Sequence, residues 1–484
     1  MVPYLNKLKM SYRLGLLLFL VSLSGCRVMH TPPKMPDVSL PVSFVGSDDS
    51  TTIGRLPRQT LFADKNLVQL IDTALTQNPD LRMALQRIEM AQASFQISRG
   101  ALLPSVNAVA AAGVDRYGKY TLNGVGNYDT NLSENIVGQS RIPNPTPDFF
   151  LGLRSSWELD IWGKLRNRRR AAYTRLLASQ EGRNLVVTAL TGEVARLYYT
   201  LLALDAELEI IRENEALQQR AVELVNVQKA AGRVTELAVQ QFTAQLLNTR
   251  SREGGVRQEI VGAENQLNTL LGRYPQPIVR GKSIEDQQIP AQILAGLPAQ
   301  LVRRRPDIRQ AERELEAANV DIAVAQAEFL PSLTLTPYIG FNAFRVSSLL
   351  DPASIAAGAL GGLAAPIFNR RLLKGNYAIS VARSREAYFA YQKTILTGVS
   401  EVVSSLKGLD NYRTVAELQR QEVAVLRQAV TTSNELFVNG YATYLEVITA
   451  QRSVLDAELA LIETKRSQFL SLIGLYRALG GGWE

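Results

Sequence analysis

The sequence predicts a duplicated α+β membrane protein, in which transmembrane β-strands alternate with long coiled-coil helices. First, residues 78–105 and 305–332 align without a gap, from a shared Pro-Asp-x-Arg to a shared Leu-Pro-Ser. Second, each copy is followed by strand candidates with alternating apolar and polar residues. Third, no proline occurs from Asp148 to Tyr274 or after Pro366, and both stretches show the heptad spacing of coiled coils.

Composition excludes most kinds of active site. The chain has 484 residues and 46% hydrophobic content, but Cys26 and His30 are its single cysteine and histidine. The body of the protein therefore lacks a structural disulfide, a Cys or His zinc site, a cysteine nucleophile and a Ser-His-Asp triad. We expect no catalysis, no metal site and no bound cofactor.

The N-terminus reads as a secretory signal. Basic residues precede the apolar run LGLLLFLVSL, and LSGC ends at Cys26. This site resembles the lipobox of bacterial lipoproteins, which implies a covalent lipid on Cys26; the alternative is an ordinary signal peptide with a coincidental cysteine. Removing residues 1–25 lowers the net charge from +8 to +5, so we expect no nucleic-acid partner. Because Arg27 follows the cysteine, and not the aspartate that retains lipoproteins at the inner membrane, we expect delivery to the outer membrane.

Six segments are expected along the chain. They are a lipoprotein signal peptide at 1–25, a proline-rich tether at 26–65, a first repeat at 66–272, a linker at 273–304, a second repeat at 305–480 and a tail at 481–484. Each repeat should consist of a short helix, a β-hairpin and a long helical pair. The first carries about 20 extra residues between its strands, polar and rich in Gly, Asn and Pro as in an exposed loop.

Each repeat begins with a helix of about 24 residues that starts at a proline and is ended by Pro104 or Pro331. These two prolines mark helix-to-strand junctions. In FFLGLRSSWELDI the odd-numbered apolar residues from Phe149 to Ile161 share one face, and LTLTPYIGFNA alternates likewise. One face suits lipid and the other water, as in a barrel strand; a half-buried sheet in a soluble domain is the alternative. Alanine and glycine blur the pattern in the other two candidates, 105–117 and 353–367.

The proline-free stretches predict helical hairpins. One helix should run from about Gly163 to Ala230, roughly 100 Å at 1.5 Å per residue. The apolar seams expected in the two stretches are Leu190, Val194, Leu197, Leu201, Leu204, Leu208 and Ile211, and Leu445, Ile448, Leu455, Leu459, Ile462, Phe469 and Ile473. Because four strands cannot close a barrel and open edges are not tolerated in hydrocarbon, several copies must share one barrel.

The tandem repeat, the lipobox, the repeated LPS switch and the ending LYRALGGGW resemble the TolC-like outer-membrane efflux proteins, in particular the lipoprotein branch related to OprM and NodT. The resemblance covers essentially the whole mature chain. It implies a homotrimer with a 12-stranded barrel in outer-membrane lipid and a helical tunnel through the periplasm. It also implies two partners, a periplasmic membrane-fusion adaptor and an inner-membrane pump of the resistance-nodulation-division type.

The resemblance also implies roles for individual residues. The hairpin turns would be adaptor-docking tips, formed by Gly232, Arg233, Val234 and Thr235, and by Gly440, Tyr441, Ala442 and Thr443. Glu446, just past the second turn, matches an acidic residue that rings the closed periplasmic gate, with a solvated helix residue as the alternative.

Two basic clusters follow the strands and suit either lipid phosphates or a solvated face: Lys164, Arg166, Arg168, Arg169 and Arg170, and Arg370, Arg371 and Lys374. The function predicted from the whole sequence is passive conduction of drugs or other small molecules out of the cell. A periplasmic coiled-coil adaptor or scaffold without a channel is the alternative.

Overall fold

The computed structural model describes residues 41, 43–44, 52–290, 295–368 and 370–483. The predicted signal peptide and Cys26 lie outside them. The described chain forms two compact units. Unit 1 contains Ala91–Arg175 and Leu315–Ala387, and unit 2 contains the described part of Asp37–Met90 together with Leu176–Glu314 and Tyr388–Glu484.

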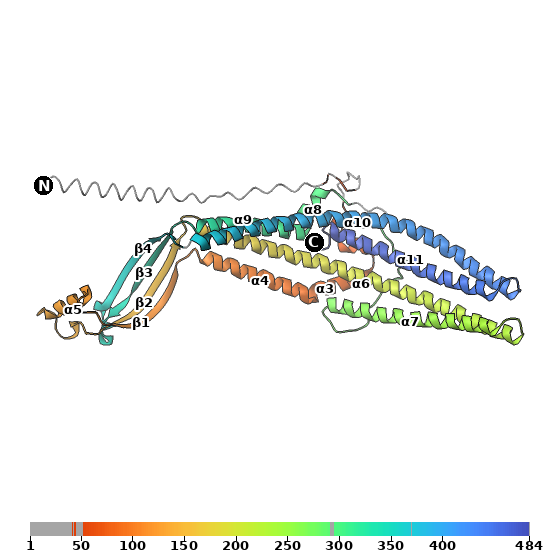
Figure 1. Cartoon of the computed structure of the whole chain (residues 1–484), viewed down its shortest axis with the longest axis horizontal. Helices are drawn as coiled ribbons and strands as arrows, with labels where there is room; N and C mark the ends of the chain where they lie inside the picture. Colours follow the sequence, from red (N-terminus) through yellow and green to blue (C-terminus); the bar gives the residue numbers. More distant parts are fainter. Residues whose placement is uncertain (1–40, 42, 45–51, 291–294, 369, 484) are drawn as a thin grey trace. The chain divides into compact units, whose positions relative to one another are not determined.

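Unit 1 contains a four-stranded antiparallel sheet in the order β1-β2-β3-β4 (Figure 1). The strands are β1 (Ser105–Asp115), β2 (Thr146–Leu159), β3 (Ser332–Ala343) and β4 (Ile355–Ala364), so all four predicted strands are confirmed. β2 pairs with β3, which joins the hairpin of the first repeat to that of the second. β1 and β4 are left as the two edges.

The pairing register gives the sheet one apolar face. Residues paired across neighbouring strands lie on the same face, and chains of pairs such as Ala108–Leu153–Ile339–Ala357 run across all four strands. The residues of this face are Val106, Ala108, Ala110, Ala112, Val114, Phe149, Leu151, Leu153, Ser155, Trp157, Leu159, Leu333, Leu335, Pro337, Ile339, Phe341, Ala343, Ile355, Ala357, Ala359, Gly361 and Leu363. Of these, Ser155 alone has a polar side chain. The alternation therefore holds even in the alanine-rich strands, where the sequence blurs it.

Two details of the sheet differ from expectation. Ile161 lies beyond the end of β2, so the apolar row stops at Leu159. On the polar face, Phe150 is buried, because the guanidinium of Arg154 lies 4.4 Å from its ring centroid and Tyr338 packs against it edge-on.

The short helices α4 (Pro79–Gly100) and α9 (Pro306–Ala327) begin at the predicted prolines. They end one turn earlier than Pro104 and Pro331, because each copy forms a turn before its strand starts. In the first copy, Leu103 N donates to Gly100 O at 2.9 Å. The insert in the first copy is not simply a loop. It forms α5 (Leu122–Leu132), capped by the Thr121 hydroxyl, and a 3-10 turn, η2 (Gly138–Ser140).

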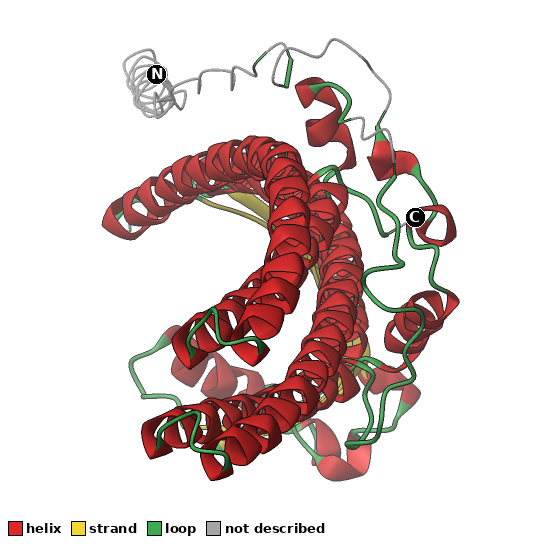
Figure 2. Cartoon of the chain, turned by 90° about the vertical axis from the view of Figure 1, so that its right-hand side faces the viewer, coloured by secondary structure: helices red, strands yellow, loops and turns green. Residues whose placement is uncertain are grey.

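Four long helices make two hairpins: α6 (Lys164–Ala230) with α7 (Glu236–Leu270), and α10 (Arg370–Val438) with α11 (Tyr444–Ala478). Figure 2 shows the two hairpin ends as neighbouring pairs of helices. Part of α6 is long and apolar enough to cross a membrane, but 61% of that window is buried inside the protein, as in a core helix.

The largest core lies in unit 2 and joins α6, α10 and α11 to shorter elements. Tyr199 of α6 stacks on Phe469 of α11 with ring centroids 4.4 Å apart. Around this core lie η1 (Ile53–Arg55), α2 (Arg58–Leu61), α3 (Lys65–Gln77) and α8 (Pro298–Arg304), whereas η3 (Val346–Ser348) and η4 (Pro352–Ser354) belong to unit 1. The linker at 273–304 therefore contains a helix and contributes buried Ile278, Ile284 and Leu301.

The predicted seams are partly correct. In α6 every predicted member except Leu208 is buried. In α11, Leu455, Ile462, Phe469 and Ile473 are buried, but Leu445 is 56% exposed and the expected seam is wrong there. Val447 is buried instead, because a second seam of α11 faces the first hairpin.

Candidate functional site at the hairpin ends

Both hairpin turns close in the same way. Gly232 and Gly440 adopt φ values of +73° and +79°, the left-handed conformation that terminates helices at low cost for glycine. Arg233 N donates to Gln228 O at 2.9 Å, and Tyr441 N donates to Leu436 O at 2.8 Å, which satisfies the last carbonyls of each helix. Thr235 and Thr443 then stand at the N-caps of α7 and α11.

The two turns share one small apolar core. It is formed by Val225, Ala238, Phe242, Phe437 and Val447, with Val234 and Ala442 packed against it. Phe242 and Phe437 lie with ring centroids 6.5 Å apart. All eight predicted tip residues lie at the surface or in this core's rim, and Tyr441 is 84% exposed. The turns thus form one end surface; whether an adaptor docks there stays a prediction.

Glu446 is part of a capping box. Its carboxylate accepts hydrogen bonds from Thr443 N at 2.8 Å and from the Thr443 hydroxyl, while that hydroxyl accepts from Leu445 N. The hydrogen bond from the Thr443 side chain, followed by that from the Glu446 N–H, lowers the pKa of this exposed carboxyl. Glu446 is therefore charged and held at the second turn. At the matching position of the first turn stands the buried Ala238.

A second seam of α11, which sequence reasoning missed, joins the hairpins. Its members recur at steps of four and three and are all buried: Val447, Gln451, Val454, Glu458 and Leu461. Glu458 accepts from Asn214 Nδ2 of α6 at 3.1 Å and from Arg427 Nε of α10 at 2.7 Å. The heptad spacing was the available signal, but two of its five positions are polar.

The strand-to-helix junction of the first repeat, where β2 leads into α6, is a network of ion pairs. Asp160 accepts from the backbone of Leu165 and Arg166, both at 2.9 Å, and from Arg166 Nε at 3.1 Å. Burial raises the pKa of Asp160, but these hydrogen bonds outweigh it and hold the pKa below its usual value. Pro331, at the helix-to-strand junction of the second repeat, contacts this network, because its carbonyl accepts from Trp162 Nε1 at 2.7 Å, whereas Pro104 is exposed.

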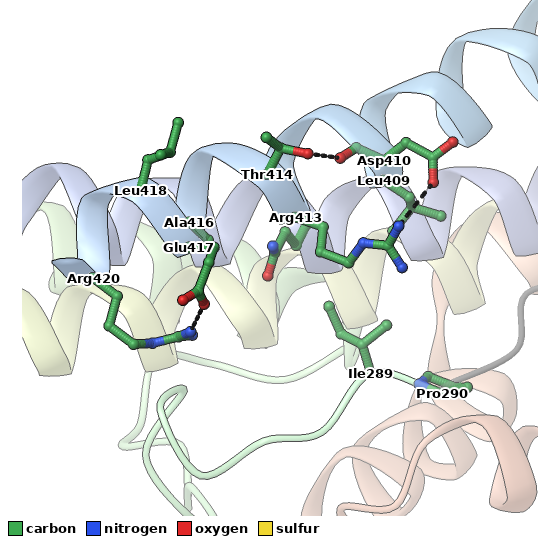
Figure 3. Close-up of a pocket in the computed structure, with 11 residues that line it drawn as sticks. Ile289, Pro290, Leu409, Asp410, Arg413, Thr414, Ala416, Glu417, Leu418 and Arg420 are labelled. Atoms are coloured by element: carbon green, nitrogen blue, oxygen red, sulfur yellow. Dashed lines mark hydrogen bonds and ion pairs between the residues drawn. The ribbon is translucent and has the colours of Figure 1, made fainter.

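A surface depression of about 800 Å³ lies beside α10 in unit 2 (Figure 3). Its charged lining is paired internally, Arg413 with Asp410 and Arg420 with Glu417, each three residues apart on the helix. Among the described residues, no group of three His, Cys, Asp or Glu side chains is arranged to hold a metal ion. The two carboxylates of this lining are therefore each paired with an arginine of the same helix.

Comparison with known proteins identifies the fold. A family model described as outer membrane efflux protein matches residues 70–273 and 297–481. The chain is 31% identical to the cation efflux system protein CusC of Escherichia coli O6:H1 (88% of each chain), and 32% identical to the pyoverdine export outer membrane protein OpmQ of Pseudomonas aeruginosa (87% and 86%). A solved structure of CusC, titled for transmembrane channel formation, superposes with a TM-score of 0.80 at 27% identity, covering 93% of this chain and all of that one.

The open sheet with one apolar face, the two long helical hairpins and their duplicated order are thus the features of a known architecture, matched over both repeats. The chain belongs to the outer membrane efflux protein family.

Proposed function

We propose that this protein is the exit duct of a tripartite efflux system, a homotrimer that passively conducts small molecules from an inner-membrane pump and a periplasmic adaptor to the exterior. Relatives that export cations and pyoverdine support the role in efflux. Because their cargoes differ so much, we assign no cargo to this chain. The Cys26 lipid would anchor the N-terminus of each copy in the same membrane.

The observation that carries the proposal is the open sheet. Its apolar face suits lipid, yet β1 and β4 each present an edge with no strand partner among the described residues. An unpaired edge costs several kcal/mol for each backbone group in hydrocarbon, so the sheet must close on other copies. Three copies would supply twelve strands, within the range of known outer-membrane barrels.

The internal duplication predicts how the copies meet. Within one chain, β2 of the first repeat pairs with β3 of the second. By the same rule, β4 would pair with β1 of the next copy. Matching the two repeats transfers the observed pair Trp157–Leu335 to the pair Leu363–Ala108 between copies.

The helices follow the same rule. α9 contacts α6 through the Asp321–Arg175 ion pair and α10 through Ser384 Oγ to Asn319 Oδ1 at 2.6 Å. α4, the equivalent of α9, contacts α6 through Phe95 and Tyr173. Its second neighbour would be α10 of the next copy. Ile97 of α4 and Leu372 and Ile379 of α10 are apolar residues at least half exposed, and this contact would bury them.

A cysteine pair tests the assembly. Leu363→Cys with Ala108→Cys should give a disulfide-linked trimer in outer membranes. Cys26 is the single native cysteine, so the two introduced thiols would form the cross-link. The matched control, Leu363→Cys with Val109→Cys, moves one thiol to the opposite face of its strand and should not cross-link. Monomers from both pairs would contradict the trimer and favour a periplasmic scaffold.

Two further tests address conduction and docking. The purified trimer should form steady ion channels in planar bilayers. In cells lacking their own duct, the chain should restore drug efflux only when adaptor and pump are present, and Tyr441→Asp at the exposed turn should abolish this rescue without changing the cross-linked trimer. Rescue in the absence of any pump would contradict the tripartite role.

A further inference from the structure

The basic clusters at the two strand-to-helix junctions, where β2 leads into α6 and β4 leads into α10, differ in their partners. In the first repeat, four members pair with carboxylates: Lys164 with Glu158, Arg166 with Asp160, Arg168 with Glu328 at 3.4 Å, and Arg170 with Glu316 at 3.6 Å. Arg175, one turn further, pairs with Asp321. This junction is largely neutralised within the chain.

The second junction keeps cations but loses the carboxylates. When Trp162 is matched with Phe368, Lys164 corresponds to Arg370 and Arg168 to Lys374. Glu158 and Asp160 correspond to Ala364 and Pro366. Arg371 and Lys374 are exposed, and neither has a carboxylate partner among the described residues.

The next copy in the proposed trimer would supply only part of the missing charge. Its α4 would stand where α9 stands in the first junction. The carboxylates Asp321 of α9 and Glu328, just past its end, correspond to Ser94 and Ala101, and Arg99 adds a further cation nearby. Glu316 corresponds to a carboxylate, Glu89, but its partner Arg170 corresponds to the uncharged Asn376. Two of the three carboxylates are therefore missing there, and most of the positive charge at the second junction persists in the assembly.

Apolar residues beside these cations complete an interfacial surface. Ile367 is 69% exposed and Phe368 is 99% exposed. They directly follow β4, whose lipid-facing row ends at Leu363. An aromatic residue at the end of a membrane strand with basic residues just beyond it is the arrangement found where hydrocarbon meets lipid phosphate.

We infer that Arg371 and Lys374 bind the phosphate of phospholipids in the periplasmic leaflet, with Phe368 at the level of the head groups. This surface rests on the proposed function, because it requires the sheet to span the membrane. The occupant is a phospholipid because the charge is positive and unpaired, and because the surface continues the lipid-facing row at the helical end of the sheet.

Native mass spectrometry of the delipidated trimer, titrated with phosphatidylglycerol, tests the inference. Arg371→Gln with Lys374→Gln should weaken binding about thirtyfold, taking about fivefold for each basic residue near an anionic lipid surface. Arg371→Lys with Lys374→Arg, which retains the charge, should bind as the original chain does. The matched control Arg413→Gln with Arg420→Gln removes two cations from the same helix in unit 2 and should leave binding unchanged.

Three outcomes would overturn the inference: equal weakening by the control pair, equal binding of diacylglycerol, which has no phosphate, and loss of the Leu363–Ala108 cross-link in the Gln pair. The last would mean that the cations contact the next copy. Failure of that cross-link in the otherwise unaltered chain would instead contradict the trimer itself, so the two failures are distinguishable.

Discussion

Glu458 of α11 accepts a hydrogen bond from Asn214 of α6 at 3.1 Å, across 244 residues of sequence. Both side chains are buried, and Arg427 of α10 donates to the second carboxylate oxygen. One carboxylate thus ties together three long helices from two hairpins. A polar contact inside an otherwise apolar seam fixes the register of coiled helices more strictly than apolar contacts do.

Glu458→Ala should destabilise the helical part of the protein. The substitution leaves the buried Asn214 amide without this acceptor, which typically costs about 1–3 kcal/mol. We expect a lower midpoint of thermal unfolding, measured by circular dichroism at 222 nm in detergent.

Asp456→Ala is the matched control. Asp456 is one half-turn away on α11, pairs with Arg252 at 2.9 Å and is exposed. Exposed pairs contribute about 0–1 kcal/mol, so the midpoint should change little. Equal effects of the two substitutions would refute a special role for Glu458.

Gly281→Ala should be disruptive although the residue lies in the linker. Tyr198 OH donates to Asp64 Oδ2 at 2.6 Å and accepts from Gly281 N at 2.8 Å. A Cβ at Gly281 would lie 2.1 Å from the same Asp64 oxygen. We expect a loss of about 1–3 kcal/mol from overpacking, measured by urea unfolding.

Gly254→Ala provides the opposite control. Gly254 lies inside α7 with open space where its Cβ would be. Alanine there should stabilise the helix by about 0.5–1 kcal/mol. If both substitutions were neutral, the close packing at Gly281 would be unimportant for stability.

Glu207 should make the stability of the protein depend on pH. Burial raises the pKa of this carboxyl from 4.5 to about 7, with Glu463 and Glu259 adding to the effect and Arg466 opposing it. The folded state therefore binds the proton more tightly than the unfolded state, and stability should fall as pH rises from about 4.5 to about 7.

Replacing Glu207 by Gln should remove this fall, because the amide does not titrate. Unfolding midpoints measured from pH 4 to pH 8 test this. Glu209→Gln, on the exposed side of the same helix, should leave the original pH profile unchanged. A Glu207→Gln profile as steep as the original would show that another group is responsible.

Much of the fold could be predicted from the sequence because its signals are local. Prolines fix where α4 and α9 begin, and glycines at 232 and 440 fix where the hairpins turn. The pairing of β2 with β3 could not be predicted, since it depends on two strands brought together by the fold. That register is what shows the apolar face in the alanine-rich β1 and β4.

The candidate site was predicted less completely. The exposed turn residues follow from the glycine positions, but the seam with Gln451 and Glu458 does not follow from an apolar pattern. Its polar members are buried because partners on α6 and α10 satisfy Glu458, and such partners are visible only in three dimensions. Glu446 was predicted as a gate residue without its local role in capping α11.

The two roles of Glu446 are separable by two substitutions. Glu446→Gln removes the charge but retains an amide oxygen that can accept from Thr443 N, as glutamine does in capping boxes. Thr443→Ala removes the capping hydroxyl but retains the charge.

Three copies of Glu446 around a closed aperture would attract cations, so Glu446→Gln should reduce the cation preference in planar bilayers and Thr443→Ala should not. In thermal unfolding Thr443→Ala should have the larger effect, and its protein should be less stable than Glu446→Gln by about 1 kcal/mol. Unchanged ion selectivity of Glu446→Gln would leave this residue as a helix cap and remove it from the gate.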